Sequence, residues 1–321
     1  MSNKWIVGVD LGGTSVKLAF VQEDGEILHK WEIPTDKSEQ GINILSDINE
    51  SINEKLMSLG ETKDKLIGIG MGAPGAVDKE KGIIYEAVNL GWPKNYPIVE
   101  ILSDLSNLPV EIDNDANCAA LGEMWKGAGN GARDIVCITL GTGVGGGVIV
   151  NGSIVQGVKG AAGEIGHITI IPDGGAPCNC GKTGCLETIA SATGIARIAK
   201  EALEKHNGDS ALKALYLKKG SIEAKDVFES ASHGDSLSAS IIDHVTLPLG
   251  LVLANIGNVL NPKKIVIGGG VSRAGDLLLN PLQRYFTQFA YSAVAASTEL
   301  VIATLGNDAG ILGAAWLAQN K

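Results

Sequence analysis

Val7-Gly-Val-Asp-Leu-Gly-Gly-Thr-Ser-Val-Lys-Leu-Ala-Phe-Val21 is an apolar segment, a glycine turn and a second apolar segment. It aligns without a gap with Val136-Cys-Ile-Thr-Leu-Gly-Thr-Gly-Val-Gly-Gly-Gly-Val-Ile-Val150, which begins 129 positions later (136 minus 7). The alignment predicts a duplicated β-turn-β unit that opens two α/β halves. Glycine turns present backbone N–H groups that no side chain covers, so we expect them to face one another across a cleft that suits phosphates.

The rest of the first half alternates between strand and helix patterns. Apolar residues at helical spacing between residues 42 and 59 predict a helix, and the apolar run at 66–71 predicts a strand. A further strand at 110–112 enters the acidic turn Asp113-Asn114-Asp115, and a helix is expected from 116 to 127. The acidic turn therefore lies at the carboxyl end of a strand.

Glycine is unusually frequent, with 43 residues in 321. A third cluster, Gly268-Gly269-Gly270, follows a strand-like segment and precedes a predicted helix, and Gly72-Ala73-Pro74-Gly75 ends the strand at 66–71. Each is either a tight turn or a close approach to a ligand. Three glycine loops in one chain favour a nucleotide that is held at several points.

Two glycine motifs resemble nucleotide-binding fingerprints, but the residues around each do not fit the motif. Gly141-Thr-Gly-Val-Gly-Gly146 fits the dinucleotide pattern, but a strand-like segment follows where that motif requires a helix. Gly181-Lys182-Thr183 resembles the end of a Walker A loop, but Ala176 stands where its first glycine would be.

A cysteine-rich segment carries a possible metal site. His167, Cys178, Cys180 and Cys185 form a complete tetrahedral zinc set, and Gly181 and Gly184 permit tight turns around an ion. The alternatives are a disulfide with a spare thiol, or three small buried side chains. Because Met1 to Trp5 leaves no room for a signal peptide, we expect a cytoplasmic protein with reduced thiols. Cys118 and Cys137 lie in apolar segments and are expected in the core.

Charge and hydropathy exclude two classes of partner. The net charge is −10 and the isoelectric point is near 5.0, so the chain lacks the basic surface that nucleic-acid binding needs. No apolar run approaches the roughly twenty residues of a membrane-spanning helix, so we expect no membrane association.

Together these motifs resemble the ROK family of bacterial sugar kinases, and within it the glucokinases of Gram-positive bacteria. The resemblance runs nearly end to end, and the segment from Cys178 to Glu187 is its most specific part. It implies an α/β protein of the actin-like, hexokinase-like ATPase fold, in which two α/β domains flank a cleft. We expect an N-terminal domain at 1–119 and a C-terminal domain at 120–306, which carries the zinc motif and a dimerisation surface. The resemblance also implies that a helix at 307–321 packs back on the first domain.

The resemblance implies that ATP phosphorylates the 6-hydroxyl of glucose. Asp115 matches the general base, although by position it could instead cap the following helix. The implied sugar ligands are Gly75, Asn114, Asp115, Glu164, His167 and Glu187. The implied contacts to ATP and Mg²⁺ are Asp10, Gly12, Gly13, Thr14, Lys17, Gly141, Thr142, Gly143, Gly269 and Gly270.

His167 has two implied roles, because one ring nitrogen binds a structural Zn²⁺ with Cys178, Cys180 and Cys185 while the other faces the sugar. Family members often carry glutamate where Asp113 stands, a change that keeps the charge.

Three other functions share these motifs. Some relatives are sugar-binding repressors, but no helix-turn-helix precedes the first strand here. A kinase of another hexose, such as mannose, fructose or an N-acetylated hexosamine, would use the same ligand types. The third is a sugar-binding protein without catalysis, which substitution of Asp115 by Ala tests, since unchanged activity would remove the assignment of Asp115 as the base. The expected partners are glucose, ATP and a second copy of the chain.

Overall fold

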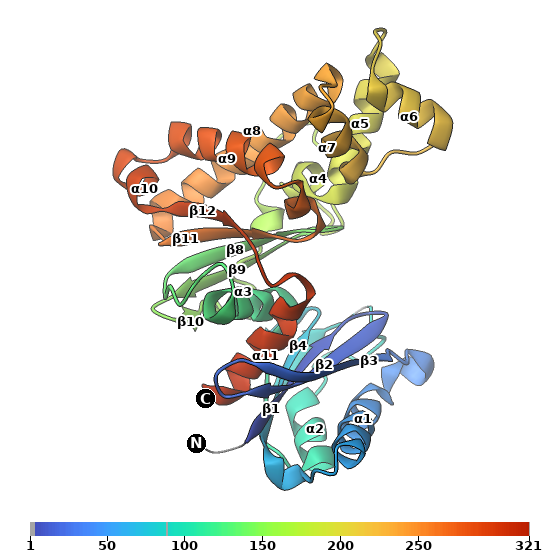
Figure 1. Cartoon of the computed structure of the whole chain (residues 1–321), viewed down its shortest axis with the longest axis vertical. Helices are drawn as coiled ribbons and strands as arrows, with labels where there is room; N and C mark the ends of the chain where they lie inside the picture. Colours follow the sequence, from blue (N-terminus) through green and yellow to red (C-terminus); the bar gives the residue numbers. More distant parts are fainter. Residues whose placement is uncertain (1–3, 88, 321) are drawn as a thin grey trace. The chain divides into compact units, whose positions relative to one another are not determined.

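The computed structural model describes residues 4–87 and 89–320, which form two compact units (Figure 1). The first unit comprises Met1–Ala132, Gly147–Gly163 and Leu305–Lys321, and the second comprises Arg133–Gly146 and Glu164–Thr304. The expected boundary between residues 119 and 120 falls inside helix α3 (Asp115–Lys126) and differs from this division.

The first unit is built on a five-stranded sheet with the order β3-β2-β1-β4-β7. Strands β1, β2 and β3 are antiparallel, and β4 and β7 run parallel to β1. The sequence predicted β1, β2, β4 and β7, and the observed bounds of the five strands are β1 Trp5–Leu11, β2 Ser15–Gln22, β3 Ile27–Pro34, β4 Leu66–Ala73 and β7 Val110–Asn114. A separate hairpin consists of β5 Ala76–Asp78 and β6 Ile83–Glu86.

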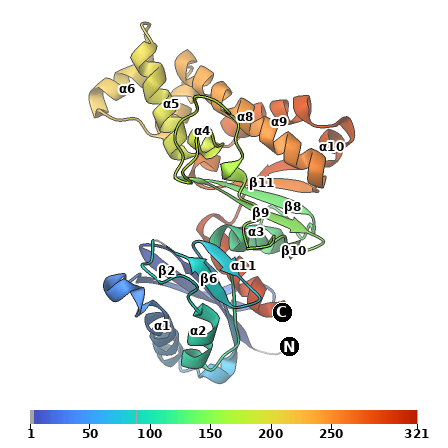
Figure 2. The same cartoon turned by 180° about the vertical axis from the view of Figure 1, so that it is seen from behind.

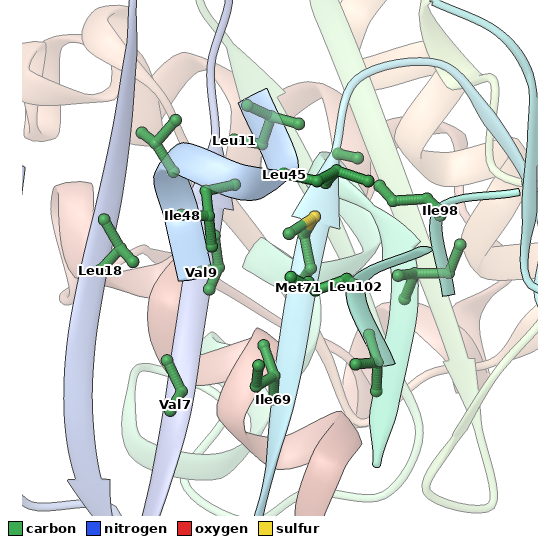
Figure 3. Close-up of a cluster of buried hydrophobic side chains, with 14 of the residues drawn as sticks. Val7, Val9, Leu11, Leu18, Leu45, Ile48, Ile69, Met71, Ile98 and Leu102 are labelled. Atoms are coloured by element: carbon green, nitrogen blue, oxygen red, sulfur yellow. The ribbon is translucent and has the colours of Figure 1, made fainter. Parts of the chain in front are cut away.

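Helices cover both faces of this sheet. Alternate residues of β1 and β4, among them Val7, Val9 and Met71, pack against α1 (Ile44–Ser58) and α2 (Ile98–Ser106) in one core (Figure 3). On the other face Ile6 packs against α11 (Ala309–Gln319), which also contacts β4 and α3. The short 3₁₀ turn Gly306–Asp308 precedes α11.

Glycines, which carry no side chain, let α11 come close to the sheet and to α3. A Cβ at Gly70 would lie 1.7 Å from the Ala314 carbonyl oxygen, and one at Gly313 would lie 1.6 Å from that of Cys118. Real Cβ contacts do not fall below about 3.0 Å, so only glycine fits at either position. These contacts fix the start of α3, where the acidic turn lies.

The second sheet has the order β10-β9-β8-β11-β12 and repeats the hairpin of the first (Figure 2). As predicted, β8 (Ile135–Leu140) runs through a glycine turn into β9 (Val144–Val150), and the division between the units falls within β9. The remaining strands are β10 Ser153–Ile154, β11 Lys264–Gly268 and β12 Glu299–Ile302. Because β9 follows the glycines directly, the dinucleotide fingerprint is excluded.

The helices of the second unit are α4 Glu187–Ala190, α5 Ala192–Lys205, α6 Ala211–Lys219, α7 Ala224–Ser232, α8 Ser236–Leu260, α9 Asp276–Phe289 and α10 Ser292–Ser297. Helices α8 and α9 pack against each other. Among the described residues, α8 is the one helix long and apolar enough to cross a membrane by length and composition. In the most apolar 18-residue stretch of α8, 56% of the residues are buried, as in the core helix of a globular unit.

Candidate active site

The acidic turn lies where β7 ends and α3 begins. Asn114 has extended backbone angles and is the N-cap of α3, because its Oδ1 accepts from the N–H groups of Ala116 at 2.9 Å and Asn117 at 3.4 Å. Its Nδ2 donates to the Gly75 carbonyl at 3.0 Å. The structure therefore brings Gly75 and Asn114 together and assigns the cap to Asn114.

Asp115 is the first residue of α3, and its carboxylate is not the cap. Its side chain keeps contact with solvent, and Oδ1 accepts from the Ala116 N–H at 2.9 Å. Desolvation raises the pKa of Asp115, and hydrogen bonds from the surrounding backbone and from Asn114 oppose that rise only in part. A carboxylate whose pKa is raised is a stronger base.

Asp113 is buried beneath the same turn, a role that sequence reasoning missed. Its Oδ1 accepts from the Asn114 N–H at 2.8 Å and from Asn117 Nδ2 at 2.7 Å, and its Oδ2 accepts from Gln156 Nε2 at 2.6 Å. Burial raises the pKa of Asp113, and these hydrogen bonds oppose the rise. All three partners donate, so the carboxylate joins β7, α3 and the segment after β10. An acidic residue ending an apolar strand was the available signal.

The first glycine turn, Gly12-Gly13-Thr14, joins β1 to β2. Gly12 donates to the Ser15 carbonyl at 3.0 Å, whereas the N–H groups of Gly13 and Thr14 have no acceptor among the described residues. Asp10 is the last but one residue of β1 and lies beside this turn. Burial raises the pKa of Asp10, Lys17 at 3.8 Å lowers it, and the charge of Asp115 raises it further. Unpaired N–H groups beside a carboxylate suit a phosphate with its cation.

The second glycine turn, Gly141-Thr142-Gly143, has the same character. Gly141 donates to the Gly143 carbonyl at 2.9 Å, and within the described chain no acceptor faces the N–H groups of Thr142 and Gly143. The next N–H, that of Val144, donates to Glu187 Oε2 at 2.9 Å. Glu187 thus ties this turn to the cysteine segment.

The zinc motif forms one cluster in which the four candidate ligand atoms of His167, Cys178, Cys180 and Cys185 lie within 4.8 Å of one another. Cys180 Sγ and Cys185 Sγ are 3.7 Å apart, and Cys178 Sγ lies 3.5 Å from His167 Nδ1. Tetrahedral zinc with Zn–S bonds of about 2.3 Å and Zn–N bonds of about 2.05 Å separates two sulfurs by about 3.8 Å, and sulfur from nitrogen by about 3.5 Å. The donor set and its spacing fit zinc, and none of the described cysteines forms a disulfide.

Two carboxylates flank the cluster. His167 Nε2, the nitrogen turned away from the cysteines, lies 3.8 Å from Glu164 Oε2. Glu187 Oε1 lies 3.7 Å from Cys178 Sγ. The structure therefore gathers three of the predicted sugar ligands, Glu164, His167 and Glu187, around one rigid element.

A cavity of about 690 Å³ opens in the second unit. Thr142 and Gly270 line it, together with Phe228 and Lys225 of α7 and with Arg273. Gly269, which precedes the lining residue Gly270, has φ +84°, and a Cβ there would lie 2.5 Å from the Leu140 carbonyl oxygen. The lining from α5 and α7 was not predicted, since ordinary amphipathic helices carry no signal of a pocket.

The predicted residues fall in both units. The first unit holds Asp10, Gly12, Gly13, Thr14, Lys17, Gly75, Asn114 and Asp115. The second unit holds Gly141, Thr142, Gly143, Glu164, His167, Cys178, Cys180, Cys185, Glu187, Gly269 and Gly270.

Comparison with known proteins gives consistent matches along the chain. The sequence model of the ROK family matches residues 6–321. A glucokinase of Halalkalibacterium halodurans is 55% identical over 321 residues, which are 100% of this chain and 97% of that protein. A xylose repressor of Caldicellulosiruptor bescii is 31% identical over 96% of this chain and 76% of the repressor.

Among solved structures, a ROK family glucokinase from Streptomyces griseus in complex with glucose and AMPPNP superposes with a TM-score of 0.77 at 33% identity. The match covers 99% of this chain and 100% of that one. The actin-like, hexokinase-like fold expected from the sequence is thereby confirmed.

Proposed function

The chain belongs to the ROK family, and from that premise we propose that it transfers the γ-phosphoryl group of ATP to the 6-hydroxyl of glucose. The observation that carries the catalytic part is that Asn114 caps α3, which leaves the carboxylate of Asp115 available as a base. The 55% identity with a glucokinase supports glucose as the acceptor.

Asp115 acts as the general base. A sugar hydroxyl is a weak nucleophile, and a positioned carboxylate that accepts its proton as the phosphoryl group transfers speeds such a step by about 10²- to 10⁴-fold. The raised pKa of Asp115 supports this role, because it brings the proton affinity of the carboxylate nearer to neutral pH. Gly75 and Asn114 orient the sugar beside it.

Each unit offers backbone donors for phosphate oxygens at its own glycine turn. The N–H groups of Gly13 and Thr14 and those of Thr142 and Gly143 donate to phosphate oxygens. Asp10 would hold Mg²⁺ through water, which neutralises charge on the transferred group, and Lys17 orients Asp10. The cavity beside Gly269 and Gly270 receives the adenosine moiety, and its size suits that group.

Zinc would be structural, held by Cys178, Cys180, Cys185 and Nδ1 of His167. A metal on Nδ1 leaves Nε2 as a hydrogen-bond donor of fixed direction, which suits a sugar hydroxyl beside Glu164. Glu187 accepts from a second hydroxyl. The proposal also includes a cytoplasmic homodimer, which sedimentation of the purified protein tests.

The decisive experiment is a coupled assay with ATP-Mg²⁺ against glucose, mannose, fructose and N-acetylmannosamine, with zinc content measured on the same sample. We expect preferred turnover of glucose and about one zinc per chain. Preferred turnover of another hexose would reject glucose as the substrate and keep the mechanism. Sugar binding without phosphorylation of any of the four would refute the kinase.

A further inference from the structure

Two carbonyl groups of the first glycine turn, those of Gly12 and Thr14, accept hydrogen bonds from one residue that no sequence motif identifies. We propose that Thr35 is a positioning residue for the nucleotide phosphates, because its hydroxyl fixes the direction of the peptide group between Gly12 and Gly13. The inference rests on the proposed function, since it assumes that this turn binds phosphate.

Thr35 follows β3 directly and is buried, with 8% of its surface exposed. The register of the β2–β3 pair places Ser15 opposite Pro34, so the residue after the strand lies beside the turn. From there Thr35 Oγ1 donates to the Gly12 carbonyl at 2.7 Å, and the Thr35 N–H donates to the Thr14 carbonyl at 3.0 Å.

The direction of a carbonyl determines the direction of the next N–H. In a planar trans peptide, the C=O of one residue and the N–H of the following residue point in opposite directions. The hydroxyl of Thr35 holds the Gly12 carbonyl toward the protein, so the Gly13 N–H points away from Thr35. Gly12 and Gly13 have no side chain to resist a peptide flip, and a flip would present a carbonyl oxygen in place of an N–H. A phosphate would then meet an acceptor where it needs a donor.

The second turn follows the same rule with different donors. The Ala192 N–H donates to the Gly141 carbonyl at 2.8 Å, and Thr193 Oγ1 donates to the Thr142 carbonyl at 2.9 Å. The first bond fixes the direction of the Thr142 N–H, and the second fixes the direction of the Gly143 N–H. Two turns related by duplication thus have their carbonyls fixed by unrelated segments, which indicates that carbonyl direction matters at both.

The test is calorimetric titration of the full-length protein with AMPPNP and Mg²⁺, and separately with adenosine. Thr35→Val removes the hydroxyl and keeps the volume, and Thr35→Ser keeps the hydroxyl. Thr298→Val is a matched control, because Thr298 is also buried, at 5% exposure, and donates through its N–H and Oγ1 (2.7 Å, to the Pro262 carbonyl) far in sequence from both turns. Thr35→Ala is a second variant should the valine fail to fold.

We expect Thr35→Val to raise the dissociation constant of AMPPNP about tenfold, which corresponds to one hydrogen bond at about 1.4 kcal/mol per factor of ten. Thr35→Ser and Thr298→Val should stay within about twofold of wild type on the same scale. Adenosine has no phosphate, so its affinity should not change.

Equal AMPPNP affinities of Thr35→Val and Thr298→Val would overturn the inference. An equal loss of adenosine and AMPPNP affinity would also overturn it, because it would show a general structural defect. Failure of the wild-type protein to bind AMPPNP would instead refute the proposed function itself.

Discussion

Gly143→Ala should disturb the carboxylate of Glu187 and, through it, the link between the second glycine turn and the cysteine cluster. A Cβ at Gly143 would lie 2.4 Å from Glu187 Oε2, and contacts below 3.0 Å do not occur. The carboxylate must therefore retreat by at least 0.6 Å (3.0 minus 2.4). The same oxygen accepts from the Val144 N–H at 2.9 Å, and a retreat along that bond would lengthen it to about 3.5 Å (2.9 plus 0.6), the limit of a hydrogen bond.

A hydrogen bond to a charged group contributes about 1.5–3 kcal/mol, so its loss should lower the free energy of unfolding by about 2 kcal/mol. Replacing glycine by alanine also removes freedom from the unfolded chain, which stabilises by about 0.4–1 kcal/mol. Gly141→Ala in the same turn isolates the first effect, because a Cβ there meets nothing within 4 Å. Both variants gain the same stabilisation from the reduced freedom of the unfolded chain, and only Gly143→Ala loses the hydrogen bond to Glu187.

The assay is thermal unfolding of both variants without ligand, followed by calorimetric titration with glucose. We expect Gly143→Ala to melt about 4–8 °C below Gly141→Ala, at about 2–4 °C per kcal/mol for a domain of this size. Glucose affinity should fall about tenfold or more in Gly143→Ala, because Glu187 is displaced. Equal melting temperatures would refute the reasoning, since they would show that Glu187 moves without losing a stabilising contact.

Asp115→Asn should lower kcat by about 10²- to 10⁴-fold with little change in glucose affinity, and an unchanged kcat would remove Asp115 as the base. In the wild-type protein the acid limb of the pH profile should lie above the ordinary aspartate pKa of 3.8, and in the variant it should disappear with the activity. Burial alone would raise the pKa of Asp235, but hydrogen bonds at the start of α8, the largest from the Ser238 N–H, outweigh it and lower the pKa to about 2. A carboxyl group whose pKa is lowered in the folded state stabilises the fold at pH values above its unfolded-state pKa, so Asp235→Ala should lower the free energy of unfolding by about 2 kcal/mol at neutral pH. Urea unfolding should show this difference shrinking as the pH falls from about 4 to 2. Cys180→Ser should release zinc and lower the melting temperature, and a variant that keeps one zinc per chain with unchanged melting would contradict the cluster.

The strands and glycine turns were predictable because their signals are local. The apolar runs around Gly12 and Gly141 are long, are bounded by glycines and repeat one another, and each became a hairpin. The cysteine cluster was equally predictable, since ligand type and spacing together specify a zinc set. Local composition was sufficient in both cases.

Other features depended on contacts that no local pattern encodes. Asn114 and Asp115 are both good N-caps, and only the extended backbone of Asn114 decides between them. The unit boundaries were not predictable because the chain returns to the first unit at Gly147 and again at Leu305. Thr35 acts through hydrogen bonds to a turn more than twenty residues away, so its neighbours in the chain give no indication of its role. Asp113 ends an apolar strand, which was a local signal, but its bond from Gln156 was not predictable.

The alignment of the two halves also indicates why a cation would be held at one turn and not at the other. Under the alignment of the two halves, Asp10 corresponds to Thr139 and Lys17 to Gly146, so the ion pair beside the first turn has no counterpart beside the second. The unpaired N–H groups occur in both turns. Backbone donors are what any phosphate requires, whereas a carboxylate at the turn is needed only where a divalent cation is held. We therefore expect Asp10→Asn to weaken nucleotide binding most in the presence of Mg²⁺, and a loss of equal size without Mg²⁺ would show that Asp10 serves the turn itself.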